Sequence, residues 1–281
     1  MLNRQVWKMS FFCQLLFLLI AAAKGRNVHP TQLAQTTVVK DSFVAQPVPL
    51  NPHAVKFVKN FIKTNNEDLL KAKERSQYCF TMMDSVFEAY ELPVELKYLA
   101  VVESNLNRTA VSPVGAAGPW QLMPSTARQL GLKVSDRYDE RKRFGKSTVA
   151  AAKYLRDLYN EFDDWLLAIA AYNGGPGPVY KAIRLSGSRN FWKLQNFLPM
   201  ETRAHVKRYI GTHYFFEGEG SLTTLTKAET QKHLEEVAGL EMKFYNHSDN
   251  NDSAFVSGSR SAASKIDDKI FADVLTIHKT H

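Results

Sequence analysis

Three short segments of this 281-residue chain carry the polar side chains that could do chemistry. They are residues 103–105 (Glu-Ser-Asn), the glycine-rich residues 115–124, and residues 171–177, in which Tyr172 and Asn173 precede two glycines. A carboxylic acid that an apolar site keeps neutral near pH 7 can protonate a poor leaving group such as a glycosidic oxygen. The three segments therefore suit a groove that grips a sugar chain and delivers one proton to it.

A second acid is missing from the neighbourhood of Glu103. Most glycosidases place two carboxylates across the scissile bond, but residues 104–135 contain no Asp or Glu. The next acids, Asp136, Asp139 and Glu140, lie in a charge cluster that we interpret as a surface loop. A carboxylate from elsewhere in the chain stays possible, yet its local absence favours a mechanism in which the substrate supplies the nucleophile.

The helix that positions Glu103 is expected to open at Pro93, which suits a first turn, and to run over residues 94–103. Leu96, Leu99, Ala100 and Glu103 then share one face at spacings of three and four. Glu103 sits at the C-terminal end, where the helix dipole is negative. Burial and the dipole should both raise the pKa of its carboxyl group.

The glycine-rich segment is expected to bring the backbone close to a bound group. Gly115 and Gly118 permit tight turns, and Gln121 offers both a donor and an acceptor, as a sugar N-acetyl group requires. Trp120 is expected in the core, whereas Met123 suits either the core or the groove.

Three further polar residues each have two interpretations. Ser112 could hydrogen-bond to Glu103 or cap a loop. Tyr172 and Asn173 could line the groove or end a buried helix against Gly174 and Gly175, and these two roles are compatible.

Hydrophobic spacing predicts a mainly α protein with no strand-rich repeat. Ser147 is the expected N-cap of the helix over residues 148–162, and Asp163 or Asp164 that of the next helix. The remaining helices are expected from residue 51 and over residues 67–90, 124–131, 165–172, 178–185, 199–216 and 227–241.

The domain organisation is expected to follow five ranges. Residues 1–23, with two basic residues, an apolar run and three alanines, are typical of a secretory signal peptide. An uncleaved membrane anchor and a lipoprotein signal at Cys13 are the alternatives. Residues 24–50 are interpreted as a linker, 51–92 as an N-terminal helical extension and 93–218 as the catalytic domain. Residues 219–281 form a partly disordered tail of unassigned role.

Charge and cysteine content exclude several classes. Removal of the signal peptide would lower the formal net charge from +8 to +6, and the basic residues are scattered among acids, which disfavours a nucleic-acid module. Cys79 would be the one remaining thiol, so neither an internal disulfide nor a metal site can be built from it. We expect a small buried residue there, no cofactor, and a monomer.

The motifs occur in an order that resembles a known family. Glu103-Ser104, the segment 115–124, Ala171-Tyr172-Asn173-x-Gly175 and Glu201-Thr202-Arg203 together look like the soluble lytic transglycosylase family, in particular its membrane-bound type D relatives. The resemblance covers about residues 66–218, and it is supported by residues 139–141 and 150–155.

This resemblance implies a lysozyme-like helical domain that cleaves the MurNAc–GlcNAc β-1,4 bond of peptidoglycan without water. Glu103 would protonate the leaving oxygen, the MurNAc N-acetyl group would stabilise C1, and Glu103 would then activate the C6 hydroxyl to close a 1,6-anhydro ring. The family positions that contact the substrate or the acid match Ser112, Gln121 and Met123, and Tyr172 and Asn173 match groove residues. Ser104, next to the acid, can hydrogen-bond around it and is a further candidate for substrate binding. The implied location is the periplasm of a Gram-negative bacterium, in contact with glycan strands and associated with the envelope.

One departure from the family pattern concerns the last motif, where a Tyr usually precedes the Val and this chain has His205 before Val206. His205 could replace the lost hydrogen bond, or Tyr209 one helical turn on could take its place. This departure is the reason for one alternative, a peptidoglycan-binding protein with a weakened site. A muramidase that uses water is the enzymatic alternative. Pro119, where Leu or Met is usual, is a smaller departure.

Overall fold

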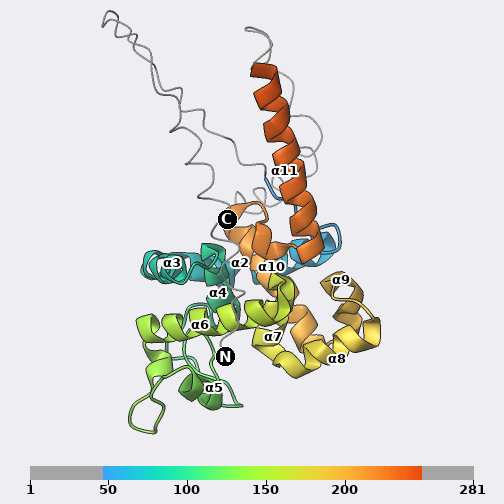
Figure 1. Ribbon diagram of the computed structural model, residues 1–281. Coiled ribbons are helices and arrows are strands. Elements are labelled where there is room, and N and C mark those ends of the chain that lie inside the picture. Colours follow the sequence, from blue (N-terminus) through green and yellow to red (C-terminus); the bar gives the residue numbers. More distant parts are fainter. Residues whose placement is uncertain (1–46, 249–281) are drawn as a thin grey trace, which may run out of the picture. The chain divides into compact units, whose positions relative to one another are not determined.

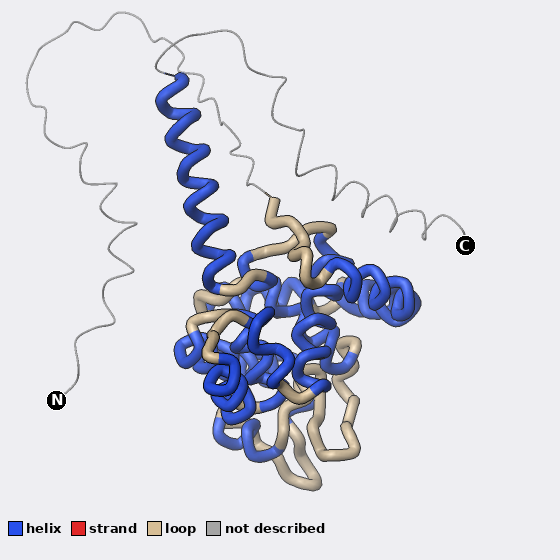
Figure 2. The backbone as a smooth tube through the Cα atoms, turned by 90° about the vertical axis from the view of Figure 1, so that its right-hand side faces the viewer, coloured by secondary structure: helices blue, strands red, loops and turns tan. Residues whose placement is uncertain are grey.

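The computed structural model describes residues 47–248, with side chains up to Leu240. Within this range the chain forms helices and isolated β-bridges but no strand (Figures 1 and 2). The mainly α prediction is therefore confirmed. The predicted signal peptide, most of the linker and most of the C-terminal tail lie outside the described residues.

The helices follow one another with short connections. The α-helices are α2 (Val55–Ser76), α3 (Phe80–Ala89), α4 (Tyr98–Ser104), α5 (Pro124–Gln129), α6 (Phe144–Phe162), α7 (Trp165–Gly174), α8 (Pro176–Ser186), α9 (Phe191–Leu194), α10 (Met200–Glu217) and α11 (Lys227–Ser248). Short 3-10 turns are η1 (Val94–Lys97), η2 (Glu140–Lys142), η3 (Gln195–Phe197) and η4 (Leu222–Thr224).

Helix α7 forms the centre of the core, and all its residues from Trp165 to Tyr172 are buried. A helix that is apolar on every side must be enclosed by others, and α7 packs against α6, α8 and α10. Asp164 caps its N-terminus by accepting a hydrogen bond from the Leu167 N–H at 3.1 Å. The structure thus selects Asp164 over Asp163 as the cap.

The N-terminal helices join the same core, because α2 packs along α10 and α3 packs against η1 and α6. The predicted boundaries here were wrong. Helix α2 continues through residue 67 with only a kink at Asn65, and the real break falls at Gln77–Cys79. Cys79 is a buried free thiol whose pKa burial raises to about 11, which confirms the structural role expected for it.

Two predictions near α6 are corrected. The helix begins at Phe144, one turn before the expected start, and the Ser147 hydroxyl donates to the Arg143 carbonyl instead of capping an N-terminus. The charge cluster before it is not a surface loop throughout, since Glu140 and Arg141 are buried. Glu140 accepts from the Lys133 N–H at 2.7 Å and pairs with Lys146.

The 3-10 turn η1 and the short helix α4 together position Glu103. Pro93 precedes the 3-10 turn η1, which leads into α4, and Asn105 ends α4 in the left-handed conformation at φ 50°. Leu99, Ala100 and Val101 are buried, so α4 is anchored in the core by its first half. Glu103 therefore lies at the C-terminal end of a buried helix, as the sequence predicted.

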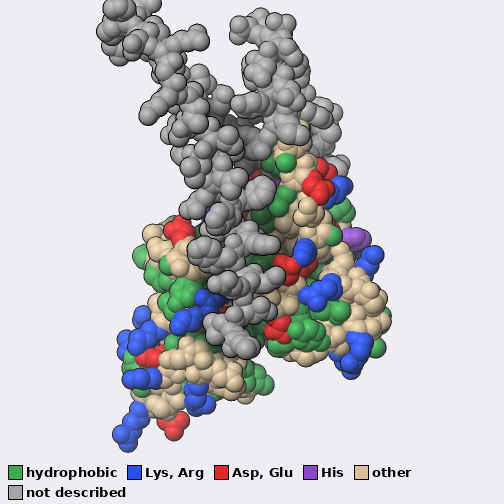
Figure 3. Space-filling view, viewed as in Figure 1, with side chains coloured by type: hydrophobic (Ala, Val, Ile, Leu, Met, Phe, Trp, Pro, Cys, Tyr) green, Lys and Arg blue, Asp and Glu red, His purple; other side chains and the backbone are tan. Residues whose placement is uncertain are grey.

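The segment after α10 is buried against the core at η4 and then continues into α11. Thr223 and Thr224 of η4 are buried, and Val48 bridges Gly220. Helix α11 begins at Lys227 as predicted but runs on to Ser248, and it projects from the other helices in Figure 1. On the part of the surface visible in Figure 3, Lys and Arg side chains are dispersed among acidic and apolar ones.

Candidate active site

Glu103 and His205 form the centre of the candidate site. Glu103 lies on α4 and His205 on α10, and His205 Nε2 is 2.9 Å from Glu103 Oε1. The two side chains are 12% and 2% exposed. Between the two candidates for the missing family Tyr, it is His205 that reaches the acid.

The Tyr209 side chain takes part in other hydrogen bonds. It is fully buried, and its hydroxyl hydrogen-bonds Thr223 Oγ1 at 2.7 Å and donates to the Glu95 carbonyl at 3.3 Å. Tyr209 thus fixes η4 and η1 against α10, and α10 in turn packs against α4.

Tyr172 links α7 to the glycine-rich segment. Its hydroxyl donates to the Trp120 carbonyl at 2.8 Å, and its ring packs against Tyr154 at 5.4 Å. Burial raises the pKa of Tyr172 well above its ordinary value, and the negative charge of Glu103 adds to the rise. The hydroxyl therefore stays protonated as a donor close to the acid.

Asn173 is held by Thr202 of α10, whose Oγ1 donates to Asn173 Oδ1 at 2.9 Å. A side chain at the next residue, Gly174, would lie 2.6 Å from that same Thr202 oxygen, so glycine allows the close approach. The Asn173 Nδ2 group makes no hydrogen bond within residues 47–248. It remains a donor for a bound group.

The glycine-rich segment folds into a tight loop that is hydrogen-bonded to α4. Ser104 Oγ donates to the Pro119 carbonyl at 2.9 Å, and Ser112 Oγ accepts from the Ala116 N–H at 3.0 Å. Gln121 adopts φ 43° and its Nε2 donates to the Gly118 carbonyl at 2.8 Å. Ser104 and Ser112 thus act here in shaping the loop, while Oε1 of Gln121 is left as an acceptor.

The remaining two residues of this segment behave differently from each other. Trp120 is fully buried and its Nε1–H donates to Thr148 Oγ1 at 3.0 Å, which confirms the expected core position. Met123 is 41% exposed, so its side chain is available at the surface of the loop.

Arg141 is a residue whose role the sequence interpretation missed. Its guanidinium donates to the Gly115 and Leu122 carbonyls at 2.7 and 2.9 Å and pairs with Asp139. The pairing lowers the pKa of Asp139. The adjacent Asp-x-Arg spacing was a signal for this pair, but its contact with the loop joins residues far apart in sequence.

Two of the three acids that next follow Glu103 in the chain bind basic partners. Asp139 binds Arg141 and Glu140 binds Lys133 and Lys146, while Asp136 is exposed. Among the residues with described side chains, no group of three His, Cys, Asp or Glu residues could hold a metal ion. The chemistry that this arrangement supports is proton transfer by one carboxyl group.

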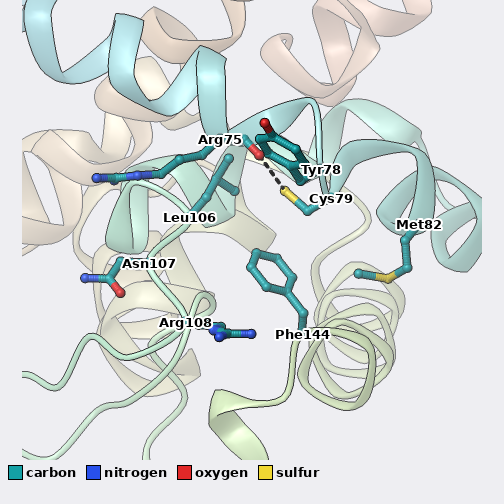
Figure 4. A pocket seen from close by; sticks show the side chains of 8 residues that line it. All are labelled: Arg75, Tyr78, Cys79, Met82, Leu106, Asn107, Arg108 and Phe144. Atoms are coloured by element: carbon teal, nitrogen blue, oxygen red, sulfur yellow. Dashed lines mark hydrogen bonds between the residues drawn. The ribbon is translucent and has the colours of Figure 1, made fainter.

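A separate hollow of about 600 Å³ opens between the end of α2, the start of α3 and the loop after α4 (Figure 4). Leu106 and Phe144 face it, Arg75 and Arg108 border it, and the Cys79 thiol donates to the Arg75 carbonyl. Glu103 does not line this hollow, which no sequence pattern predicted.

The fold is thus a helical domain in which Glu103 and His205 meet beside the glycine-rich loop. Residues 88–195 match the family model of the transglycosylase SLT domain. The match includes Glu103, the glycine-rich segment and Asn173 and ends before His205.

Two relatives share this part of the chain. Membrane-bound lytic murein transglycosylase D of Escherichia coli strain K12 is 44% identical over 124 residues, which are 42% of this chain and 27% of the relative. Membrane-bound lytic murein transglycosylase F of Maricaulis maris is 40% identical over 114 residues, which are 36% of this chain and 24% of the relative. The chain spans about a quarter of the length of these relatives.

Among solved structures, the 70 kDa soluble lytic transglycosylase SLT70 of Escherichia coli is similar to 53% of this chain, at 26% identity and a TM-score of 0.46. The alignment covers 26% of that structure. No helix within the described residues is long and apolar enough to cross a membrane.

Proposed function

We propose that this protein is a peptidoglycan lytic transglycosylase that cleaves the MurNAc–GlcNAc β-1,4 bond and leaves 1,6-anhydroMurNAc ends. The observation that carries the proposal is Glu103, a mostly buried carboxyl group at a helix end, held by His205 at 2.9 Å within a domain of the SLT family. The names of the relatives point to murein as the substrate.

The first step breaks the bond between C1 of MurNAc and the oxygen of GlcNAc. Glu103 transfers its proton to that leaving oxygen, which departs with the bonding electrons as a hydroxyl group. The carbonyl oxygen of the MurNAc N-acetyl group bonds to C1 and takes over the positive charge. Asp139 and Glu140 are bound to basic partners, so the substrate's own group is the better candidate for this role.

The second step uses the same carboxyl group as a base. Glu103, now ionised, accepts the proton of the C6 hydroxyl while that oxygen attacks C1 and the acetamido oxygen leaves. Glu103 returns to its protonated state and no water is consumed. The cycle therefore needs one carboxyl group that alternates between two states, in agreement with the single carboxyl group at the centre of the site.

The groups around Glu103 would bind the glycan. Nδ2 of Asn173 and Oε1 of Gln121 are free to bond to an N-acetyl group, and Met123 offers an apolar contact at the loop surface. Tyr172, Ser104 and Ser112 would hold the walls of the groove in place. Glycan strands of the cell envelope are the proposed partner and the periplasm of a Gram-negative bacterium the proposed location, reached through the N-terminal signal.

The test separates turnover from binding on purified sacculi. We expect Glu103→Gln to lower the release of soluble fragments by about 10²- to 10⁴-fold, the usual contribution of a general acid, while co-sedimentation with sacculi is retained. Glu88→Gln, at an exposed position on α3, is the matched control and should behave as the wild type. A Glu103→Gln protein that still releases fragments at the wild-type rate would refute the assignment, and a wild type that binds but releases nothing would indicate a binding protein.

A further inference from the structure

The contact between His205 and Glu103 constrains which oxygen of the acid can react. Oε1 is engaged by His205 Nε2 at 2.9 Å. Oε2 makes no hydrogen bond within the described residues, and it is absent from their buried polar atoms that lack a partner, so it keeps access to solvent. The two oxygens of one carboxyl group are thus made unequal by the fold.

The surroundings of His205 also constrain its protonation. The side chain is 2% exposed, and its second nitrogen, Nδ1, is buried without a hydrogen-bond partner among the described residues. An imidazolium would place a charge and a second N–H donor there with nothing to accept it, which costs the full desolvation of both. A neutral ring with its proton on Nε2 leaves only a weak acceptor unpaired.

We propose that His205 is a neutral positioning residue whose Nε2–H donates to Oε1 of Glu103 throughout the reaction, so that Oε2 alone gives and takes the catalytic proton. This inference rests on the proposed function and deepens it. In the acid step Oε1 is the carbonyl oxygen of the protonated carboxyl group, and in the base step it is one oxygen of the carboxylate. It accepts the same hydrogen bond in both states.

The proposal explains how a histidine can lie beside an acid that has to donate its proton. A charged histidine would hold Glu103 ionised through an ion pair and remove the proton that cleavage needs. A neutral N–H donor orients the carboxyl group without doing so. The site thus requires a donor at this position and does not require a group that titrates.

Two variants separate the donor from the imidazole. His205→Gln keeps an N–H donor at about the reach of Nε2, and His205→Leu removes it at similar volume. We expect the kcat of His205→Leu on sacculi to fall about 10- to 100-fold, the effect of one hydrogen bond to a charged group, with KM unchanged. His205→Gln should retain a kcat within about tenfold of the wild type and the same pH–rate profile. A Gln variant as poor as Leu, with the melting temperature preserved, would overturn the proposal.

The deciding measurement does not depend on activity. Nitrogen-15 NMR of histidine-labelled full chain, with the His205 signals assigned by their loss in His205→Gln, reports the ring state directly. We expect a ring that carries its proton on Nε2 under the conditions of the activity assay. A ring protonated at Nδ1, or at both nitrogens, under those conditions would contradict the proposal even if the protein proves inactive on sacculi. Conversely, an inactive protein with the expected tautomer would refute the proposed function alone.

Discussion

At the residue scale, Gly118 shows why the glycine-rich loop tolerates little change. Its φ is +80°, and a Cβ there would lie 1.9 Å from the backbone carbonyl oxygen of Arg141. Arg141 in turn bonds the loop at Gly115 and Leu122. A side chain at Gly118 must therefore push apart the two backbones that frame the loop.

We expect Gly118→Ala to lower the free energy of unfolding by more than about 3 kcal/mol, in the range of severe steric changes. Gly115→Ala is the matched control, because Gly115 has φ +86° but open space where its Cβ would be. It should lose only about 1–2 kcal/mol, the cost of the left-handed conformation. Urea denaturation of both variants checks this, and equal losses would show that backbone conformation alone matters.

The individual residues of the site were predictable to different degrees. Glu103 and Asn173 could be found from helix ends and glycines, since those are local signals. The contact of Arg141 with the loop and the hold of Thr202 on Asn173 could not, because each bridges elements that only tertiary packing brings together.

At the scale of elements, the junction between α6 and α7 depends on Asp164. Its two carboxylate oxygens accept from the Leu167 N–H at 3.1 Å and the Lys227 N–H at 2.7 Å, so that one residue caps both α7 and the start of α11. We expect Asp164→Ala to cost about 1–3 kcal/mol, a lost cap and a further unpaired donor.

Asp163→Asn is the control for that variant. Asp163 stands next to Asp164, in the left-handed position that Asn also tolerates, and its ion pair with Lys227 is exposed. The change should cost less than about 1 kcal/mol. If the denaturation midpoint falls equally for both variants, the cap at Asp164 does not stabilise the junction between α6 and α7.

Helix interiors were easier to predict than helix ends. The apolar run of α7 required a buried helix, and the structure has one. The break at Gln77–Cys79 and the early start of α6 were not visible, because neither carries a proline, a glycine pair or a capping side chain at the boundary. Packing of α3 against η1 and α6 decides those ends instead.

At the scale of the whole molecule, two buried groups make stability depend on pH in opposite senses. Burial lowers the pKa of His213 to about 4, against the smaller effect of the Glu217 charge, and its ring packs on Tyr98 at 5.3 Å. Its folded pKa lies below the ordinary 6.5, so stability is lost as the pH falls from 6.5 towards 4. Burial raises the pKa of Asp164 to about 6, so its unfavourable charge is relieved as the pH falls below 6.

Because these contributions overlap, the prediction concerns a difference between proteins. We expect His213→Phe to remove the acid sensitivity due to the imidazole. Between pH 7.5 and pH 5 the wild type should lose about 2 kcal/mol relative to this variant. Parallel urea titrations at the two pH values measure the difference, and identical pH slopes would mean that His213 titrates normally in the fold.

The most direct test of the central claim is the chemical form of the glycan ends that the full chain releases from purified sacculi, determined by mass spectrometry. If Glu103 both donates and recovers the proton while the C6 hydroxyl closes on C1, the MurNAc ends will be one water molecule lighter than reducing ends, and Glu103→Gln will produce neither. Predominantly reducing ends would show that water is the nucleophile and would contradict the transglycosylase mechanism.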